Sequence, residues 1–227
     1  MTILTRLVLA CVSAAALSAA AFAQQQEHLR LFRPEDLGLL EPPDRDVWQR
    51  PEEIMDALQI AEGSVVADLG AGSGWFTIRL ARRVLPTGKV YAEDIQQPMV
   101  SAMNLRIKRE GLEKIVTTVL GTPSDPRLPP NALDAVLIVD AYHEMEDPVV
   151  LLRNVGASLK PGGRLGIVNF TKEGFGPGPP MEERVDPERV IRDAEAAGLR
   201  LNSRPEILPY QYLLVFERAK LTSAKLP

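Results

Sequence analysis

The sequence predicts an α/β protein built on a largely parallel sheet, and three observations carry this prediction. Short apolar or β-branched runs alternate along the chain with amphipathic stretches of helical periodicity. Glycines, prolines and Asp-Pro pairs mark most of the boundaries between the two kinds of segment. Strands that alternate with helices form a parallel sheet with helices on both faces. The last two strand candidates follow one another without a helix, so we expect a hairpin that makes one of them antiparallel.

The first 23 residues have the layout of a secretory signal peptide. Arg6 precedes an apolar run over Leu7–Ala21, and Ala21-Phe22-Ala23 then fits a small-x-small cleavage site. The run has about 15 residues, fewer than the ~20 that a membrane-spanning helix needs. We therefore expect cleavage after Ala23, an exported protein that is periplasmic or secreted, and no stable membrane insertion after cleavage.

Two other interpretations of this leader stay open, an uncleaved membrane anchor and a lipoprotein. Val8-Leu9-Ala10-Cys11 loosely resembles a lipid-attachment box, but the apolar run continues past the cysteine. Cleavage after Ala23 would remove the only cysteine, so the mature chain would have neither a thiol nor a disulfide.

The rest of the chain is expected to hold one domain with a short extension at each end. Residues 24–49 are polar and contain three prolines, which indicates a lead-in segment that lies across the domain. The domain is expected over residues 50–220, and a C-terminal tail over residues 221–227. The sequence has no internal repeat that would indicate a solenoid.

Five helices are expected in the domain. Pro51 suits the first turn of the first helix, and the carboxylates of Glu52 and Glu53 suit the positive end of its dipole. Two further helices begin at Asp-Pro pairs, in which the aspartate acts as an N-cap. The helices are expected over residues 51–60, 74–84, 98–110, 147–159 and 186–198.

Seven strands are expected, and one of them has a clear position in the sheet. Residues 133–139 form an apolar run, as expected for a strand that is buried on both faces. The strands are expected over residues 64–68, 89–93, 115–120, 133–139, 164–170, 199–204 and 211–217. Residues 171–181 contain three glycines and three prolines and form a long connection, which indicates either a lid or a plain surface loop.

Composition and charge exclude several classes of function. The 227 residues carry a net charge of -4, whereas a protein that binds a nucleic-acid backbone needs a basic surface. Aromatic residues make up only 5%, which argues against a stacking platform for single strands. Two histidines and one cysteine are too few for a Cys/His zinc site. We expect neither a nucleic-acid partner nor a metal.

A glycine-rich turn follows the first expected strand, with the sequence Asp68-Leu-Gly70-Ala-Gly72-Ser-Gly74. In an open α/β sheet, ligands bind beyond the carboxyl ends of the strands, and glycines there let the backbone approach a ligand closely. The spacing G-x-G-x-G differs from the G-x-G-x-x-G of turns that support a pyrophosphate. The carboxylate of Asp68 suits a ligand with a positive charge, such as an ammonium or a sulfonium.

Asp94 ends the second strand region, 24 residues after Gly70. A carboxylate at this place can accept hydrogen bonds from both hydroxyls of a ribose, so the spacing predicts a cofactor that contains a nucleoside. Its neighbour Glu93 alternates to the other side of the strand, and we expect its replacement to change cofactor affinity little. A turn without a ligand and a solvated carboxylate are the alternatives.

Four motifs in this order resemble the class I methyltransferases that use S-adenosylmethionine. They are D-L-G-A-G-S-G, V-Y-A-E-D-I, L-D-A-V-L-I-V-D-A-Y-H-E and L-K-P-G-G-R-L-G-I-V. The resemblance covers residues 50–218 and is closest to the small-molecule methyltransferases of ubiquinone and menaquinone biosynthesis. It implies a three-layer sandwich with a seven-stranded, mostly parallel sheet whose last strand is antiparallel. It also implies methyl transfer from S-adenosylmethionine to a small-molecule acceptor that the sequence does not identify.

The resemblance implies cofactor contacts at seven positions: Asp68, Gly70, Ala71, Gly72, Asp94, Ile95 and Thr122. Asp68 would face the amino group of the methionine portion, and the turn over residues 70–72 would pass under it. Asp94 would hold the ribose hydroxyls, and Ile95 would pack on the adenine. Thr122 would border the adenine edge, at a position where relatives often carry an acid.

The fourth strand ends in Asp140-Ala-Tyr142-His143, where the acceptor of the methyl group is expected to lie. Methyl transfer from a sulfonium is a direct displacement that depends on alignment, and a general base helps when the acceptor is a hydroxyl or an acidic carbon. His143 can act as such a base near neutral pH, and Asp140 and Tyr142 are expected to border the acceptor. The alternative for His143 is a packing role under the next helix.

The expected signal peptide raises a question about cofactor supply, which leaves a second function open. S-adenosylmethionine is made in the cytosol, so an exported enzyme needs a supply of cofactor that the sequence does not explain. An exported binding module of the same fold, which binds S-adenosylmethionine or a related nucleoside without catalysis, is therefore the alternative. A nicotinamide-dependent oxidoreductase is a third hypothesis.

Overall fold

The computed structural model describes residues 31–174 and 176–219. The chain forms two units, residues 1–36 and residues 37–227, and the architecture below is that of the second unit. The expected signal peptide and the expected C-terminal tail lie outside the described residues.

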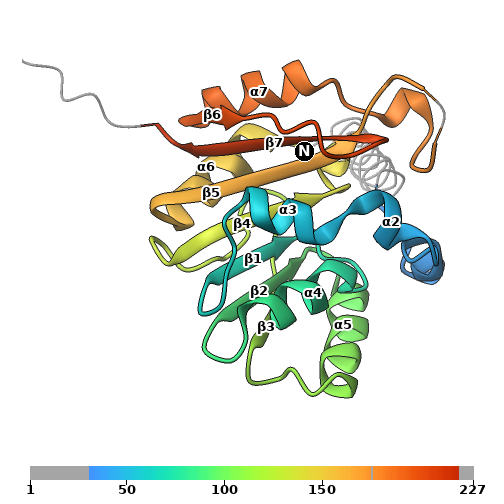
Figure 1. Ribbon diagram of the computed structural model, residues 1–227, viewed down its shortest axis with the longest axis vertical. Helices are drawn as coiled ribbons and strands as arrows, with labels where there is room; N and C mark the ends of the chain where they lie inside the picture. The colour runs from blue at the N-terminus through green and yellow to red at the C-terminus, as the bar shows by residue number, and fades with distance from the viewer. Residues whose placement is uncertain (1–30, 175, 220–227) are drawn as a thin grey trace, which may run out of the picture. The chain divides into compact units, whose positions relative to one another are not determined.

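Seven strands form one sheet. They are β1 (Val65–Leu69), β2 (Lys89–Asp94), β3 (Val116–Leu120), β4 (Leu133–Val139), β5 (Leu159–Phe170), β6 (Leu199–Ser203) and β7 (Gln211–Arg218). Their order across the sheet is β3-β2-β1-β4-β5-β7-β6 (Figure 1). Neighbouring strands pair in parallel except at β7, which is antiparallel to both β5 and β6. The predicted fold class and its antiparallel last strand are confirmed.

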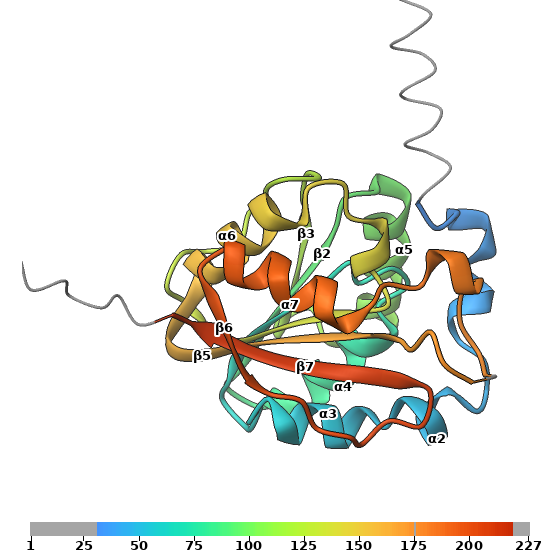
Figure 2. The ribbon, with the colours of Figure 1, turned by 90° about the horizontal axis from the view of Figure 1, so that it is seen from above.

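Helices cover both faces of the sheet. They are η1 (Pro34–Leu40), α2 (Arg45–Gln49), α3 (Pro51–Ala57), α4 (Trp75–Val84), α5 (Gln97–Arg109), η2 (Tyr142–Glu144), α6 (Pro148–Ser158), η3 (Met181–Glu183) and α7 (Pro187–Ala196). The apolar sides of α3, α4 and α5 share one core cluster, and those of α6 and α7 share another. Figure 2 shows α3 and α4 on one side of the sheet and α6 and α7 on the other.

Strand β4 shows how the two cores divide. Ala135 and Leu137 belong to the cluster under α3, α4 and α5, whereas Val136 and Ile138 belong to the cluster under α6 and α7. All four side chains are at most 1% exposed. Successive side chains of a strand point to opposite faces, so a strand covered on both faces needs the apolar run that the sequence contains.

Strand β5 begins at Leu159, five residues earlier than expected. Leu133 of β4 pairs with Leu159, but Ala135 pairs with Arg164, so β5 carries extra residues between these two points. The sequence Pro161-Gly162-Gly163 predicts a turn between the end of a helix and the start of a strand. Gly162 takes a φ of +82°, and Gly163 lies close to the backbone of β4. Strand β5 therefore pairs with β4 on both sides of this irregular segment.

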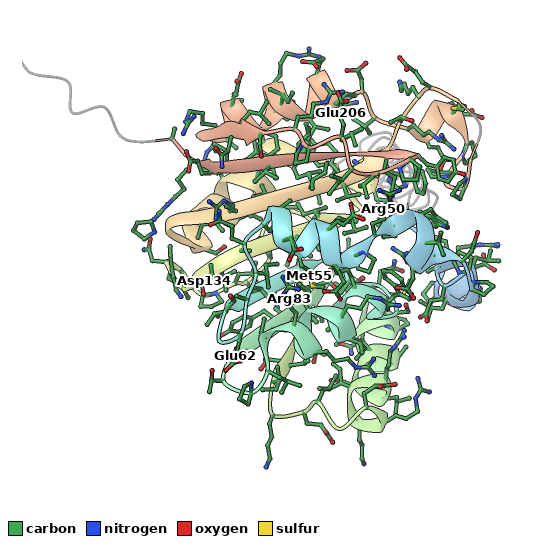
Figure 3. All side chains as sticks on the ribbon, viewed as in Figure 1. Arg50, Met55, Glu62, Arg83, Asp134 and Glu206 are labelled. Atoms are coloured by element: carbon green, nitrogen blue, oxygen red, sulfur yellow. The ribbon has the colours of Figure 1, made fainter. Side chains whose placement is uncertain are left out.

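The lead-in segment is more structured than its composition indicates. Its described part contains η1 and α2, and Arg50 joins α2 to α3 with a left-handed φ of 48° (Figure 3). Arg50 is the C-cap of α2 and the N-cap of α3, so the two short helices meet at one residue. A positive φ of 56° at Gln59 accompanies the end of α3, which is three residues shorter than expected.

We expect Gly163→Ala to lower the free energy of unfolding by about 1–3 kcal/mol, because the added methyl would meet backbone atoms that cannot yield. A Cβ at this position would lie 2.8 Å from the carbonyl oxygen of Leu133 and 3.0 Å from that of Lys160. Urea denaturation measures the loss. Gly38→Ala is the control, since a Cβ there meets nothing within 4 Å, and equal stability of the two variants would contradict the prediction.

Candidate active site

The turn between β1 and α4 requires glycine at three positions. Gly70, Gly72 and Gly74 have φ values of 70°, 54° and 79°, a region that side chains with a Cβ rarely adopt. A Cβ on Gly70 would also lie 2.6 Å from the Cβ of Ala141, which follows β4. The turn therefore lies directly against the carboxyl end of β4, where the sequence predicts the acceptor side of the site.

Asp68 is buried at the end of β1 and is 2% exposed. The hydroxyl of Thr77 on α4 donates a hydrogen bond of 2.6 Å to its Oδ2. Burial raises the pKa of Asp68 to about 6, against the lowering effects of the Thr77 hydroxyl and the nearby Arg45. The carboxyl is thus positioned by α4 before any ligand arrives.

Asp94 fastens the end of β2 to the glycine-rich turn. The backbone N–H of Gly72 donates to Asp94 Oδ2 at 3.0 Å, and the N–H of Gln96 donates to Oδ1 at 2.8 Å. Burial raises its pKa, and these backbone donors oppose the rise. The structure therefore brings Asp94 and the turn together, as the predicted ribose contact requires.

The sequence pattern does not predict how deeply Glu93 is buried beside the glycine-rich turn. Glu93 points to the other side of β2, but it is only 2% exposed, and its Oε2 accepts a hydrogen bond of 3.4 Å from the N–H of Gly70. A Cβ on Gly121 would lie 1.8 Å from Glu93 Oε1, so the glycine makes room for this carboxyl. Burial, and then the charge of Asp94, raise the pKa of Glu93 to about 8. Strand alternation predicts the direction of the side chain but not what covers it.

The other predicted cofactor positions lie near these acids. The N–H of Ala71 donates to the carbonyl oxygen of Glu93 at 2.8 Å, which joins the turn to β2. Ile95 is partly exposed just beyond β2. Thr122 forms a tight turn in which its Oγ1 accepts a hydrogen bond of 3.0 Å from the N–H of Asp125. The hydroxyl of Thr122 is therefore already used locally.

Asp140 lies at the end of β4 in a left-handed conformation, with a φ of 55°. Gln211 Nε2 donates to both of its oxygens, at 2.7 and 2.9 Å. Gln49 Nε2 of α2 in turn donates to Gln211 Oε1 at 2.7 Å. Burial raises the pKa of Asp140 to about 7, although Arg45 and Gln211 lower it. Asp140 therefore connects the fourth strand to the lead-in segment.

The side chain of Tyr142 is buried in the core under α6 and α7. Its side chain is 3% exposed within the core under α6 and α7, and its hydroxyl donates a hydrogen bond of 2.8 Å to Asp193 of α7. Burial and this carboxylate both raise the pKa of Tyr142. Tyr142 therefore joins η2 to α7, and its predicted contact with the acceptor stays a prediction.

His143 keeps a less buried position on η2, with a side chain that is 15% exposed. Burial lowers its pKa, so the imidazole is neutral at neutral pH, while Glu183 and a hydrogen bond with Asn169 oppose that shift. Its Nε2 lies 3.9 Å from Glu144 Oε1. A neutral imidazole at the carboxyl edge of the sheet is able to accept a proton.

One arginine fastens the loop that the sequence indicates as a lid or a surface loop. Arg184 is 7% exposed and donates to three backbone carbonyls, those of Thr171, Pro177 and Pro179, at 2.9, 3.1 and 2.9 Å. Its guanidinium also lies over the ring of Phe170, 5.4 Å from the centroid. The described part of the loop is therefore held at both ends and in the middle.

Within residues 31–174 and 176–219, no three His, Cys, Asp or Glu side chains are grouped so that they could hold a metal ion. Within the same ranges, no helix is both long and apolar enough to cross a membrane.

The sequence of this chain is similar to those of known methyltransferases. Residues 67–167 match the family model described as a methyltransferase domain. The chain is 32% identical over 126 residues to the ubiquinone/menaquinone biosynthesis C-methyltransferase of Pasteurella multocida, which covers 56% of this chain and 46% of that protein. It is 38% identical over 123 residues to an uncharacterized methyltransferase of Mycobacterium bovis, which covers 54% and 46%. The chain thus spans about half the length of the curated relatives it matches.

A solved structure is similar over nearly its whole length. The crystal structure of a SAM-dependent methyltransferase from Aquifex aeolicus aligns with a TM-score of 0.77 and 29% identity. The alignment covers 82% of this chain and 98% of that chain. The similarity to that methyltransferase structure therefore extends over most of this chain.

We expect Glu93→Gln to gain stability relative to the wild type as the pH rises. Between about pH 4.5 and pH 8 the unfolded chain loses the Glu93 proton while the folded protein keeps it, so the wild-type free energy of unfolding falls through this window. Glutamine has no such proton. The free energy of unfolding of Glu93→Gln, taken relative to the wild type, should therefore rise by about 3 kcal/mol between about pH 5 and pH 8. Urea denaturation at both pH values measures it.

The exposed Glu62 is the matched control, because its side chain lies away from the sheet edge that holds Glu93 (Figure 3). Glu62→Gln should change the free energy of unfolding little at either pH. A relative stability of Glu93→Gln that did not depend on pH would show that Glu93 ionises normally in the folded protein.

Proposed function

The chain carries a class I S-adenosylmethionine-dependent methyltransferase domain, and on that premise we propose that it binds S-adenosylmethionine and transfers the methyl group to a small molecule. The observation that carries the proposal is the hydrogen bond from the Gly72 N–H to Asp94, which joins the glycine-rich turn to the acid at the end of β2. In α/β folds this pairing of a turn and an acid receives the nucleoside part of a cofactor.

The charge at the site favours S-adenosylmethionine over a neutral or anionic nucleoside. Asp68, Glu93 and Asp94 are buried around the turn, and burial raises the pKa of all three. A cation near such groups favours their ionised form, so the sulfonium and the ammonium of S-adenosylmethionine suit them electrostatically. Asp68 would face the ammonium, and Asp94 would accept the ribose hydroxyls.

When bound, the cofactor supplies an electrophilic methyl group on sulfur. The residues of this chain contribute alignment, which can account for several kcal/mol of a displacement barrier. His143 would take the proton of an acceptor hydroxyl or acidic carbon, since its imidazole is neutral at neutral pH. Asp140 would act as a positioning residue that holds α2 through Gln211.

The acceptor is proposed only as a class, a small molecule. The named relative from Pasteurella multocida is a C-methyltransferase of ubiquinone/menaquinone biosynthesis. Aromatic side chains lie at the acceptor edge of the sheet, where the rings of Trp48 and Phe170 are 5.7 Å apart. These rings support an acceptor with an apolar or aromatic portion.

Two experiments test the proposal in sequence. Calorimetric titration with S-adenosylmethionine, S-adenosylhomocysteine and NADH should show binding of the first two only, and preferred binding of NADH would favour an oxidoreductase. Transfer of a labelled methyl group into a cell extract should then label a small molecule. Tight cofactor binding with no labelled product in any extract would favour a binding module without catalysis.

The proposal also includes export, which rests on the leader sequence. Mass spectrometry of the protein from its native cell should find Gln24 at the N-terminus. A soluble cytosolic protein that keeps Met1 would overturn export and leave the methyltransferase proposal intact.

We expect Asp94→Ala to weaken the binding of S-adenosylhomocysteine roughly 30- to 150-fold, the loss expected when a charged acceptor of two hydroxyl hydrogen bonds is removed. Calorimetry measures the change. Glu93→Gln is the control, since it keeps the shape of the neighbouring side chain, and should stay within about threefold. A loss in Glu93→Gln with retention in Asp94→Ala would mean that the ribose lies against the other acid.

We expect His143→Ala to lower the rate of methyl transfer about 100-fold, because a general base acts in the transition state. Its affinity for S-adenosylhomocysteine should stay within about twofold. Tyr142→Phe is the matched variant: it loses the hydrogen bond to Asp193, which should cost about 1 kcal/mol of stability, and it should keep the transfer rate. A rate loss in Tyr142→Phe that exceeds the loss in His143→Ala would reverse the two assignments.

A further inference from the structure

Arg45 of α2 carries a buried guanidinium near the end of the sheet that holds the proposed cofactor site. The residue is 9% exposed. Its Nε donates to Gln49 Oε1 at 3.0 Å, and its Nη1 donates to the carbonyl oxygen of Leu40. The guanidinium also lies over the ring of Trp75, 4.2 Å from the centroid. These contacts hold the charge in one place at the start of α4.

The charge of Arg45 acts on acids from two different strands. Its Nη2 lies 3.9 Å from Asp140 Oδ2, and it also lowers the pKa of Asp68 through space. The distance to Asp140 exceeds a hydrogen bond, so Asp140 does not use the donors of this nitrogen. A planar guanidinium with free donors matches a carboxylate geometrically.

The position of Arg45 relates directly to the glycine-rich turn. Leu40, whose carbonyl Arg45 holds, packs so close to the turn that a Cβ on Gly72 would lie 3.2 Å from its Cδ1. The segment from Leu40 to Arg45 therefore lies against the glycine-rich turn. The proposed function assigns no other part of the cofactor to this place. The amino-acid end of the cofactor would lie beside this contact, between the guanidinium of Arg45 and the turn.

We infer that Arg45 binds the carboxylate of S-adenosylmethionine, an inference that rests on the proposed function and extends it to the lead-in segment. The amino-acid end of that cofactor carries both an ammonium and a carboxylate. Asp68 and Asp140 suit the ammonium, but they would repel a carboxylate buried beside them. Arg45 supplies the opposite charge that a carboxylate needs when it is buried.

Arg79 offers a matched control within the same structure. Its guanidinium also lies over the ring of Trp75, 3.4 Å from the centroid, and it pairs with Asp46 of α2 at 2.7 Å. Arg45 and Arg79 therefore both hold α2 against α4. Their difference is that Arg45 acts on Asp140 and Asp68, whereas the ion pair of Arg79 with Asp46 faces solvent.

The test compares two ligands that differ only in the carboxylate, S-adenosylmethionine and decarboxylated S-adenosylmethionine. Calorimetry should show that wild-type protein prefers the carboxylated ligand. Arg45→Ala should weaken S-adenosylmethionine about 10- to 100-fold, the range for a lost charge-assisted hydrogen bond. The same variant should bind the decarboxylated ligand at least as well as the wild type, because this more cationic ligand is then no longer repelled by the positive charge of Arg45. Arg45→Lys should retain part of the preference, and Arg79→Ala should retain all of it.

Several outcomes would overturn the inference. Equal losses for the two ligands in Arg45→Ala would show that Arg45 only docks α2, and unchanged binding would show that it faces no carboxylate. If Arg45→Ala does not fold, the wild-type preference and Arg45→Lys still decide. Wild-type protein that binds S-adenosylmethionine no better than its decarboxylated form overturns the inference alone, whereas protein that binds neither ligand overturns the proposed function as well.

Discussion

The burial of carboxylates around one tight turn is the constraint on which the rest of the structure depends. Asp68, Glu93, Asp94 and Asp140 come from three different strands, and their carboxyl ends meet at the same edge of the sheet. Each accepts at least one hydrogen bond, from a side chain or a backbone N–H. Burial nevertheless raises the pKa of all four. The fold therefore gives each of these four carboxyl groups a hydrogen-bond donor but leaves their negative charge only partly compensated.

Burial of these acids lowers the free energy of unfolding at neutral pH, and a cationic ligand would offset this loss. A buried acid whose pKa is raised destabilises the folded protein once the pH exceeds its ordinary value, because the unfolded chain ionises it more easily. A cationic ligand reverses that penalty, since its charge favours the ionised form. Strained or destabilised groups of this kind concentrate at functional sites, and the cluster at the turn fits that pattern.

The end of the lead-in segment, residues 41–49, contacts the same edge from outside the sheet. Gln49 reaches across 162 residues of sequence to Gln211, which in turn holds Asp140 at the end of β4. Arg106 of α5 holds the segment from another side through Glu41. At the end of β5, Arg184 donates hydrogen bonds to three backbone carbonyls of the loop that follows this strand. Side chains remote in sequence thus determine which groups a ligand at this edge can meet.

The sequence by itself determined the order of strands and helices, the buried fourth strand, the hairpin at the end and the turn with its three glycines. These features follow from local periodicity and from backbone conformations that only glycine adopts easily, and both are properties of short segments. The sequence also located Asp68 and Asp94, because their places are defined by the ends of their strands. Only the tertiary structure decided the surroundings of Glu93, the direction of Tyr142 and the burial of Arg45. Those outcomes depend on what packs against each side chain from segments far along the chain, such as Gly121 against Glu93 and α7 against Tyr142. A local pattern specifies which way a side chain points, but the free energy of burying it depends on partners that only the complete fold brings near.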